Sequence, residues 1–286
     1  MAINLATKYA GKLDQLFTAG SYTDAYINKD YDFTGAKTVE VYTVSTVELS
    51  NYDRTNTGDR FGGNNEIQDV VTAYTIGNDK CFKLTIDEGN YQQQALAKKA
   101  GEVLKAQMEE KVIPTIDANR LLKAAIGAAA VSQYYAPTAN DAYGDVLKMS
   151  AALDEAKAPQ SGRVLWVTPT FYNAIKKEIT TTVNASEYNG KLLGKGFVGE
   201  LDGTPVVKVP SSYFPTNTSA IMCHKRALLG VEQIKSVKII DDSELVDGKV
   251  LRGRFVFDSF ILNGKKNAVA AIGTGSLSWY LADISL

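Results

Sequence analysis

Two strand-like runs in the first third of the chain, residues 37–49 and 69–86, constrain its folding more than any other feature. In the first run the side chains alternate in character from Val39 to Leu49, which is the period of a strand with two different faces. A polar, Gly- and Asn-rich stretch, residues 50–68, separates the runs. A lone two-stranded ribbon is marginally stable in water, and a long unstructured loop is unusual in a compact domain. The sequence therefore predicts that another molecule buries the ribbon, most economically a second copy of the same chain.

Composition places the chain among ordinary soluble proteins. It has 286 residues, of which 45% are hydrophobic and 22% charged, and no apolar run is long enough to span a membrane. Charges at Lys8, Lys12 and Asp14 interrupt any secretory signal, so we expect a cytoplasmic protein without a membrane partner. Cys81 and Cys223 are predicted to be buried reduced thiols rather than a disulfide. The net charge of −1 and the pI of about 6.0 argue against a dedicated nucleic-acid binder.

The remaining patterns predict a mixed α+β fold. A helical pattern near the N-terminus leads into a polar, Tyr-rich stretch, residues 21–34, which we expect to be an extended arm that needs a neighbour to hold it. A long helix is expected to begin at residues 87–90, and Pro114 should kink it or end it near Val112, with a second helical segment reaching Val131. Further helices are predicted at 142–157 and 171–178, strands at 163–167, 220–230 and 267–272, and hairpins at 197–209 and 234–257.

The sequence predicts no catalytic residue, no metal ligand and no cofactor. His224 is the single histidine, and it is interpreted as structural because its neighbour Cys223 would point to the opposite face of a strand. Residues 194–199 match GxGxxG, but they run into a hairpin instead of a helix N-terminus, so they are interpreted as a flexible loop. The acidic run 241–247 lacks the ligand spacing of a calcium loop.

Four segments, in order, resemble the major capsid proteins of tailed bacteriophages, which share the Hong Kong 97-type fold. The first segment reads ATKYAGKLDQLF and leads into TVEVYTVSTVELSNYDR. The second is FKLTIDEGNYQQQ followed by AGEVLKAQMEEKVIPTIDANRL, similar to the end of the family's extended loop and its spine helix. The third is VLWVTPTFYNAIKKE with LDGTPVVKVPSSYFP, similar to the axial domain. The fourth is AIMCHKRALLGVEQIKSVKIIDD with GRFVFDSFILNGKKNAVAAI, similar to strands of the peripheral domain.

The resemblance implies a subunit of an icosahedral head shell that encloses double-stranded DNA, and it implies a division of the chain. The expected parts are an N-terminal arm (1–36), an extended β-loop (37–90), the spine helix and peripheral domain (91–139), an axial domain (140–230), peripheral-domain strands (231–272) and a C-terminal tail (273–286) that the family pattern does not place.

The same resemblance implies where subunits touch and what they touch. The expected partners are other copies in pentamers and hexamers, a portal, and packaged DNA through weak non-specific contacts. Because no long charged helical segment precedes the arm, the resemblance implies a separate scaffolding protein or none, and we expect the separate protein. Positions for the cross-links that some relatives form are not matched. The candidate contact residues are Tyr52, Arg54, Arg60 and Phe61 in the loop, Tyr9, Leu13 and Phe17 in the arm, and Glu109 and Lys111 on the spine helix.

Two other functions remain open on the sequence. An encapsulin-like bacterial compartment would keep the fold and enclose protein instead of DNA. A cytoplasmic α+β enzyme would use His224 and the carboxylates of residues 241–247.

Overall fold

The computed structural model describes residues 20–31, 33, 37–44, 46–61, 66, 68–87, 100–128, 132–134, 141–182, 199–240 and 248–273. The helices among them are α2 (Ala100–Gln107), the π-helical turn η2 (Met108–Val112), α3 (Ile113–Ile126), α4 (Ala142–Glu155), α5 (Pro169–Thr182), and the 3-10 turns η1 (Asp24–Tyr26), η3 (Ser211–Tyr213) and η4 (Asn263–Ala268). The strands are β1 (Thr38–Val44), β2 (Asp69–Thr75), β3 (Asn78–Asp87), β4 (Ser132–Tyr134), β5 (Arg163–Val167), β6 (Glu200–Leu201), β7 (Thr204–Lys208), β8 (Thr218–His224), β9 (Leu228–Ile240), β10 (Gly248–Ile261) and β11 (Val269–Gly273).

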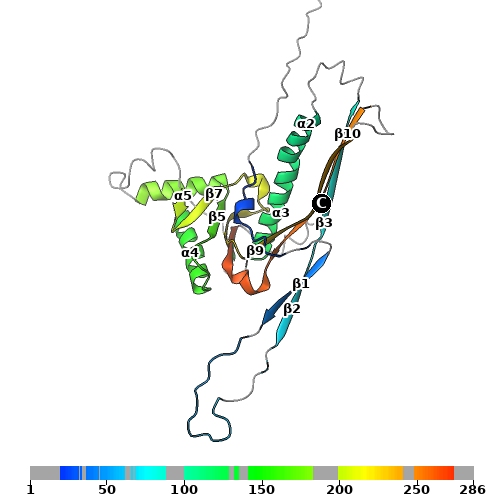
Figure 1. The fold of residues 1–286 in the computed structure, drawn as a ribbon. Coiled ribbons are helices and arrows are strands. Elements are labelled where there is room, and N and C mark those ends of the chain that lie inside the picture. The colour runs from blue at the N-terminus through cyan, green and yellow to red at the C-terminus, as the bar shows by residue number, and fades with distance from the viewer. Residues whose placement is uncertain are drawn as a thin grey trace, which may run out of the picture.

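These strands pair into three sheets, which lie in different parts of the molecule (Figure 1). The order is β1-β2 in the first, β3-β10-β9 in the second and β4-β11-β8-β5-β7-β6 in the third. Helices α4 and α5 lie at one end of the molecule, the long β3 and β10 strands lie at the other, and α2 and α3 run between them (Figure 1). The predicted α+β class is therefore confirmed.

The six-stranded sheet has a helical layer on each face. Every residue of β5 is buried, as expected for a strand covered on both sides. Val164 and Trp166 face the cluster that contains Leu121 of α3. Leu165 and Val167 belong to the cluster formed with α4 and α5. The alternation along a single strand thus separates two hydrophobic cores.

The hairpin of β6 and β7 turns at Asp202 and Gly203, which have φ angles of 49° and 67°. Positive φ at both central residues is the requirement of the two-residue type I′ turn, and Asp-Gly meets it. The turn was predicted correctly, although β6 begins only at residue 200 in the described part of the chain.

The second strand-like run is two strands instead of one, which corrects the prediction of a single run from 69 to 86. The chain breaks at Ile76 and Gly77. Ile76 is buried and donates its N–H to the Lys37 carbonyl at 3.0 Å, and Gly77 donates to the Asp258 carboxylate at 2.9 Å. Only β2 therefore pairs with β1, whereas β3 pairs with β10.

Pro114 does not end the long helix. Helices α2 and α3 are continuous through the π-helical turn η2, and Pro114 lies in the first turn of α3. A proline there lacks the N–H that the preceding turn would use, and the wider π turn accommodates this loss. The helix then ends at Ile126, five residues before the predicted Val131. Its expected start at residues 87–90 falls largely outside the described residues.

Smaller corrections concern strand ends and one cysteine. The predicted strand 220–230 is two strands, because the chain turns between His224 and Leu228. The strand predicted at 267–272 is β11, and it begins only after η4. Cys223 is buried as predicted, but Cys81 is exposed on β3, and both are free. Helix α5 extends beyond the predicted 171–178 at both ends.

Candidate assembly surfaces

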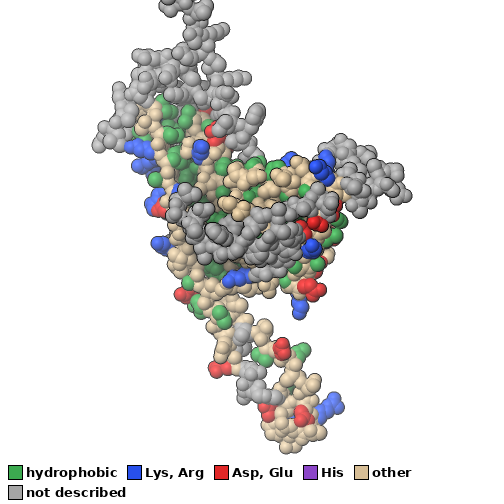
Figure 2. Space-filling view, turned by 180° about the vertical axis from the view of Figure 1, so that it is seen from behind, with side chains coloured by type: hydrophobic (Ala, Val, Ile, Leu, Met, Phe, Trp, Pro, Cys, Tyr) green, Lys and Arg blue, Asp and Glu red, His purple; other side chains and the backbone are tan. Residues whose placement is uncertain are grey.

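Residues 38–75, called the ribbon from here on, project from the body of the molecule (Figure 2). Strands β1 and β2 pair over seven positions, from Thr38 opposite Thr75 to Val44 opposite Asp69. Because residues directly opposite one another share a face, this register defines two faces of the ribbon.

The inner face packs on the body at its base. Val39, Val41 and Tyr74 belong to a cluster with Phe33, and the Tyr74 hydroxyl accepts a hydrogen bond from the Asn263 N–H at 2.9 Å. The sequence-based prediction that the ribbon has no packing partner in its own subunit is therefore wrong for this face.

The outer face is open to solvent. It carries Tyr42 opposite Val71, with exposed fractions of 64% and 47%, and Val44 at 57%. Glu40 and Asp69 lie on the same face at either end of this apolar group, and both are exposed. The outer face is thus an apolar centre between two carboxylates.

The ribbon tip has local structure, which the sequence did not predict. The Asp53 carboxylate accepts hydrogen bonds from the backbone N–H and hydroxyl of Thr55, at 2.8 and 2.6 Å. The Thr55 hydroxyl and N–H lower the pKa of Asp53. The Asp53 N–H donates to the Arg60 carbonyl at 3.1 Å, and the rings of Tyr52 and Phe61 meet edge to face at 5.0 Å. The tip therefore presents a formed aromatic pair.

Exposed apolar side chains gather on the ribbon. Of the eleven large hydrophobic side chains that are exposed in the described part of the chain, eight lie between residues 42 and 71: Tyr42, Val44, Val47, Leu49, Tyr52, Phe61, Val70 and Val71. A concentration of exposed apolar side chains in one segment indicates an interaction site. The predicted contact residues Tyr52, Arg54, Arg60 and Phe61 all lie exposed on this segment.

The segment 20–31 is held by its own subunit, which corrects the expectation that it needs a neighbour. Asp117 of α3 accepts hydrogen bonds from the Ser21 hydroxyl at 2.7 Å, the Tyr22 N–H at 2.8 Å and the Thr23 hydroxyl at 2.6 Å. Farther on, Asn28 pairs with β9 through both of its backbone groups. The start of the segment is held because one buried carboxylate accepts hydrogen bonds from three successive residues.

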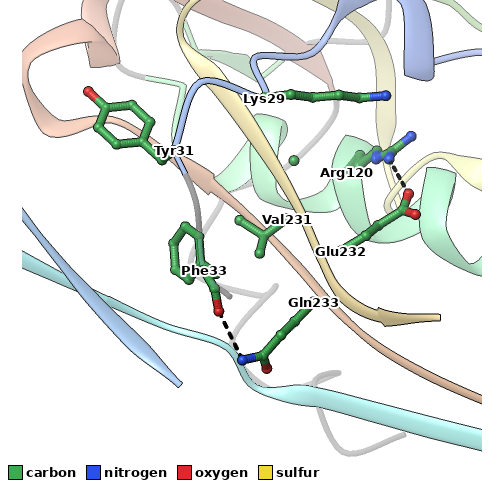
Figure 3. Close-up of a pocket in the computed structure, with 8 residues that line it drawn as sticks. Lys29, Tyr31, Phe33, Arg120, Val231, Glu232 and Gln233 are labelled. Carbon is green, nitrogen blue, oxygen red and sulfur yellow. Dashed lines mark hydrogen bonds and ion pairs between the residues drawn. The ribbon is translucent and has the colours of Figure 1, made fainter. Parts of the chain in front are cut away.

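Arg120 extends this contact to β9. It donates to the Glu232 carboxylate at 2.9 Å (Figure 3). It also donates to the Thr23 hydroxyl at 3.1 Å, and it lies 3.6 Å from Asp117. Gln233 donates to the Phe33 carbonyl at 2.9 Å (Figure 3).

The charged pair at the centre of this contact is buried, because Asp117 and Arg120 are 1% and 2% exposed. Burial alone acts to raise the pKa of Asp24 at the edge of this cluster, but Lys29 and Arg120 lower it overall.

Two cavities of about 200 and 340 Å³ adjoin Arg120. Apart from Lys235, the charged groups among their lining residues already have partners: Arg120 pairs with Glu232, and Asp24 pairs with Lys29 and Arg120. The cavities contain no histidine or cysteine among these residues. We interpret them as gaps beside an ion-pair cluster.

The other contact candidates are placed less fully. Glu109 and Lys111 lie in the π-helical turn η2, and Glu109 is 3.8 Å from the Lys105 ammonium. Lys111 is exposed. Tyr9, Leu13 and Phe17 lie outside the described residues.

His224, the centre of the enzyme alternative, has a structural environment. Its Nε2 lies 3.1 Å from the Ser161 carbonyl, and its Nδ1 accepts the Arg226 N–H at 3.2 Å. Burial lowers the pKa of His224. The Cys223 thiol is buried, which raises its pKa to about 12. The acidic run 241–247 lies outside the described residues, as does most of the glycine loop 194–199.

Within the described ranges, no three His, Cys, Asp or Glu side chains come together as a metal site. None of the helices in that part of the chain has the length and apolar character of a membrane span.

Sequence reasoning missed the Asp117–Arg120 cluster. The available signal was an Asp and an Arg three residues apart beside the apolar positions Leu121, Ala124 and Ala125. Such a pair on the packed side of a helix needs polar partners from elsewhere. The sequence could not identify Ser21 and Thr23 as those partners.

The family comparison gives one match. A family model described as phage capsid protein matches residues 86–272, which is more than half of the chain. The search of curated proteins gives no match.

Solved structures match over nearly the full length. A structure from Mycobacterium phage Che8 superposes with a TM-score of 0.75 at 16% identity, covering 95% of this chain and 98% of the other. The capsid structure of cyanophage P-SCSP1u gives 0.76 at 14% identity, with 96% and 94% covered. The bacteriophage PhiM1 mature capsid gives 0.71 at 13% identity, with 96% and 93% covered. At these identities the likeness concerns the fold.

Proposed function

Because the chain belongs to the phage capsid protein family, we propose that its ribbon is the arm by which one subunit of the shell holds the next. The chain is a major capsid protein of the Hong Kong 97 type, and many copies of it form the head shell of a tailed phage. Its family is one of structural proteins, so the proposal assigns it no catalytic role.

The observation that carries the proposal is the concentration of exposed apolar side chains on the ribbon. Leu49 is fully exposed, Phe61 is 80% exposed and Tyr42 is 64% exposed, although each would gain free energy by burial. Burial of apolar surface contributes roughly 25 cal/mol per Å². A lattice repeats the same contact in every subunit, so this free energy is gained once per subunit. The gain offsets the conformational entropy lost on ordering the ribbon, which costs about 1–2 kcal/mol for each backbone residue.

The proposed division of the chain follows the expected ranges, with two changes. Residues 1–36 are the arm, 37–90 the extended loop, 91–139 the spine and peripheral domain, 140–230 the axial domain that meets others in pentamers and hexamers, 231–272 the peripheral-domain strands, and 273–286 a tail. We move β4 and β11 to the axial part, because both pair in the sheet that contains β5, β7 and β8. The contacts of Ser21 and Thr23 with Asp117 support a second change, in which the arm reaches a neighbour only through residues before 20.

Further partners complete the proposal. They are a separate scaffolding protein, a portal, and packaged double-stranded DNA held by weak non-specific contacts, with assembly in the host cytoplasm. The net charge of −1 supports weak DNA contact, because a strongly basic shell would retain its DNA through many phosphate contacts.

Deletion of residues 52–66, closed with a short Gly-Ser linker, tests the role of the ribbon. We expect a folded subunit that no longer forms stable shells, because the deleted tip packs on nothing else in the described part of the subunit. Circular dichroism and thermal unfolding report the fold, and sedimentation with negative-stain microscopy reports the shells. Shells of normal yield and stability from the deleted chain would refute the proposal.

A further inference from the structure

One residue, Gly77, separates the ribbon from the β3-β10-β9 sheet. The ladder of the ribbon extends as far as Ile76, whose N–H donates to the Lys37 carbonyl at 3.0 Å. The pairing of β3 with β10 begins at Asn78, opposite Phe257. A hinge is a short segment of this kind, whose backbone rotation changes the angle between two ordered parts. Rotation at Gly77 would therefore change the direction in which the ribbon leaves the sheet (Figure 1).

The side chain of Asp258 holds Gly77 in place. Asp258 follows Phe257 on β10, and its Oδ2 accepts the Gly77 N–H at 2.9 Å. Its Oδ1 accepts the Ser259 N–H at 2.8 Å and lies 3.6 Å from the Lys123 ammonium of α3. Hydrogen bonds to an ionised carboxylate are stronger than those between neutral groups. The carboxylate therefore ties the residue next to the ribbon to β10 and, through Lys123, to the long helix.

The position of Asp258 in its strand is unusual for a charged residue. Residues 251–255 of β10 alternate between buried and exposed, whereas residues 256–259 are all buried. The alternation alone would leave Asp258 exposed, but it is 3% exposed. The register between β10 and β9 shifts between Val256 and Phe257, and such a bulge redirects the side chains beside it.

Apolar side chains surround this carboxylate at the base of the ribbon. Val256, two residues before Asp258, belongs to the cluster that contains Tyr74 and Ile76 of the ribbon base. A charge in such surroundings is costly unless hydrogen bonds and an opposite charge compensate it. The core at this point does not need a charge, whereas the Gly77 N–H needs an acceptor because its own ladder has ended. The arrangement is therefore specific for holding the hinge residue.

We propose that Asp258 is a positioning residue, which sets the direction of the ribbon and through it the angle between neighbouring subunits of the shell. The inference rests on the proposed function, in which the ribbon holds the next subunit. In an assembly built from one repeated contact, the rotation between neighbours decides whether the assembly closes. A ribbon free to turn about Gly77 would keep its contact surface but would not fix this rotation. Asp258 thus acts on the geometry of the shell, and the exposed side chains of the ribbon act on the contact itself.

A distance measurement on the free subunit tests the positioning. Spin labels on Thr43→Cys in β1 and Ala151→Cys in α4, two exposed sites, report the direction of the ribbon by double electron–electron resonance. Cys81→Ser removes the exposed native thiol, and Cys223 is too buried to be labelled. This labelled subunit should give one narrow distance distribution. Asp258→Asn should broaden it, because an amide has one acceptor oxygen for two N–H donors.

Asp79→Asn provides the matched comparison in the same labelled background. Asp79 lies two residues after Gly77, and its carboxylate pairs with Arg254 at the surface. This variant loses the same charge near the hinge but keeps the hydrogen bond to Gly77, so its distance distribution should stay narrow. Circular dichroism checks the fold of each variant. Asp258→Ser, whose single oxygen also cannot hold both N–H groups, replaces Asp258→Asn if the amide variant does not fold.

The geometry of the assembled protein is the second measurement, made by negative-stain microscopy without the labels. Asp258→Asn should lose the uniform shells and give open sheets, shells of several diameters or unassembled subunits. Asp79→Asn should form shells of uniform diameter. A residue that only stabilised the fold would not widen the distance distribution of a folded subunit.

Three results would overturn the inference. A broad distribution in the labelled subunit that retains Asp258 would show that this residue does not fix the ribbon. An unchanged narrow distribution in Asp258→Asn would assign the direction to other contacts, such as that of Tyr74 with Asn263. A broadened distribution with shells of uniform diameter would show that the neighbouring subunit imposes the angle. The distance measurement uses free subunits, so it is independent of the ribbon deletion that tests the proposed function.

Discussion

At the scale of single residues, Asp117 holds the segment that precedes the ribbon against α3. It is buried in α3, and it binds three successive residues of the segment that precedes the ribbon. Its neighbour Arg120 joins the same segment to β9 through Thr23 and Glu232. A buried charge pair of this kind is costly to break, because the remaining partner stays in a poorly solvated site.

Replacement of Asp117 by Asn should therefore lower the free energy of unfolding by about 3 kcal/mol, since the amide cannot accept all three hydrogen bonds and leaves Arg120 less compensated. Urea denaturation of the unassembled subunit measures the change. Asp79→Asn is the matched control, because Asp79 pairs with Arg254 at the surface and its loss should leave the midpoint nearly unchanged. Equal effects of the two variants would contradict the assigned role of Asp117.

At the scale of elements, the ribbon combines a packed face and an open face within one pair of strands. The period of two in the sequence indicates that two faces exist, but both faces carry Val, Thr and Tyr, so the pattern alone does not identify the packed one. The contacts of Val39, Val41 and Tyr74 with Phe33 decide it. The long helix is also only partly predictable from the sequence. Its apolar stripe predicts the helical segments α2 and α3, whereas the π turn before Pro114 depends on local backbone geometry.

Substitutions on the two faces should separate assembly from stability. Tyr42→Ser with Val71→Ser on the outer face should change the free energy of unfolding by no more than about 0.5 kcal/mol per site and impair shell formation. Tyr74→Ser on the inner face should cost about 3 kcal/mol, because it removes a buried ring and the hydroxyl that accepts the Asn263 N–H. Thermal unfolding and sedimentation of the same samples make the comparison. If the outer pair destabilised the free subunit like Tyr74→Ser, the outer face would have a partner within the subunit.

At the scale of the whole molecule, the subunit is a folded body with a projecting ribbon, and the body covers only one face of that ribbon. The six-stranded sheet and its two helical layers are buried, whereas the outer face and tip of the ribbon are exposed. Regions with few buried contacts open easily, and assembly should change the ribbon far more than the body.

Hydrogen exchange measures this difference directly. In unassembled subunits the amides of residues 38–44 and 69–75 should exchange much faster than those of β5 and β8, and in shells they should become protected, because the neighbour covers them. The β5 and β8 amides serve as the internal control and should change little. Strong protection of the ribbon in free subunits would contradict the model of an arm that is completed only by assembly.

Much of the candidate site could be predicted from the sequence, because it depends on local patterns. The ribbon and its polar tip follow from residue character along a short stretch, whereas the contact residues Tyr52, Arg54, Arg60 and Phe61 were named from the family resemblance. The break at Ile76 and Gly77 could not be predicted, because the carboxylate that receives the Gly77 N–H belongs to Asp258, far along the chain. The anchoring of residues 21–28 was missed for the same reason: its partners lie on α3 and β9.

The sequence by itself determined the α+β class, the strand periods, the Asp-Gly turn at 202–203 and the resemblance to the capsid family, because each is encoded in the order of neighbouring residues. Only the tertiary structure decided that β3 leaves the ribbon for β10 and that the segment before the ribbon is tied to Asp117. Those facts depend on which strands meet and in what register. Register between distant segments is fixed by the summed packing of the whole subunit, and no local stretch of sequence contains that sum.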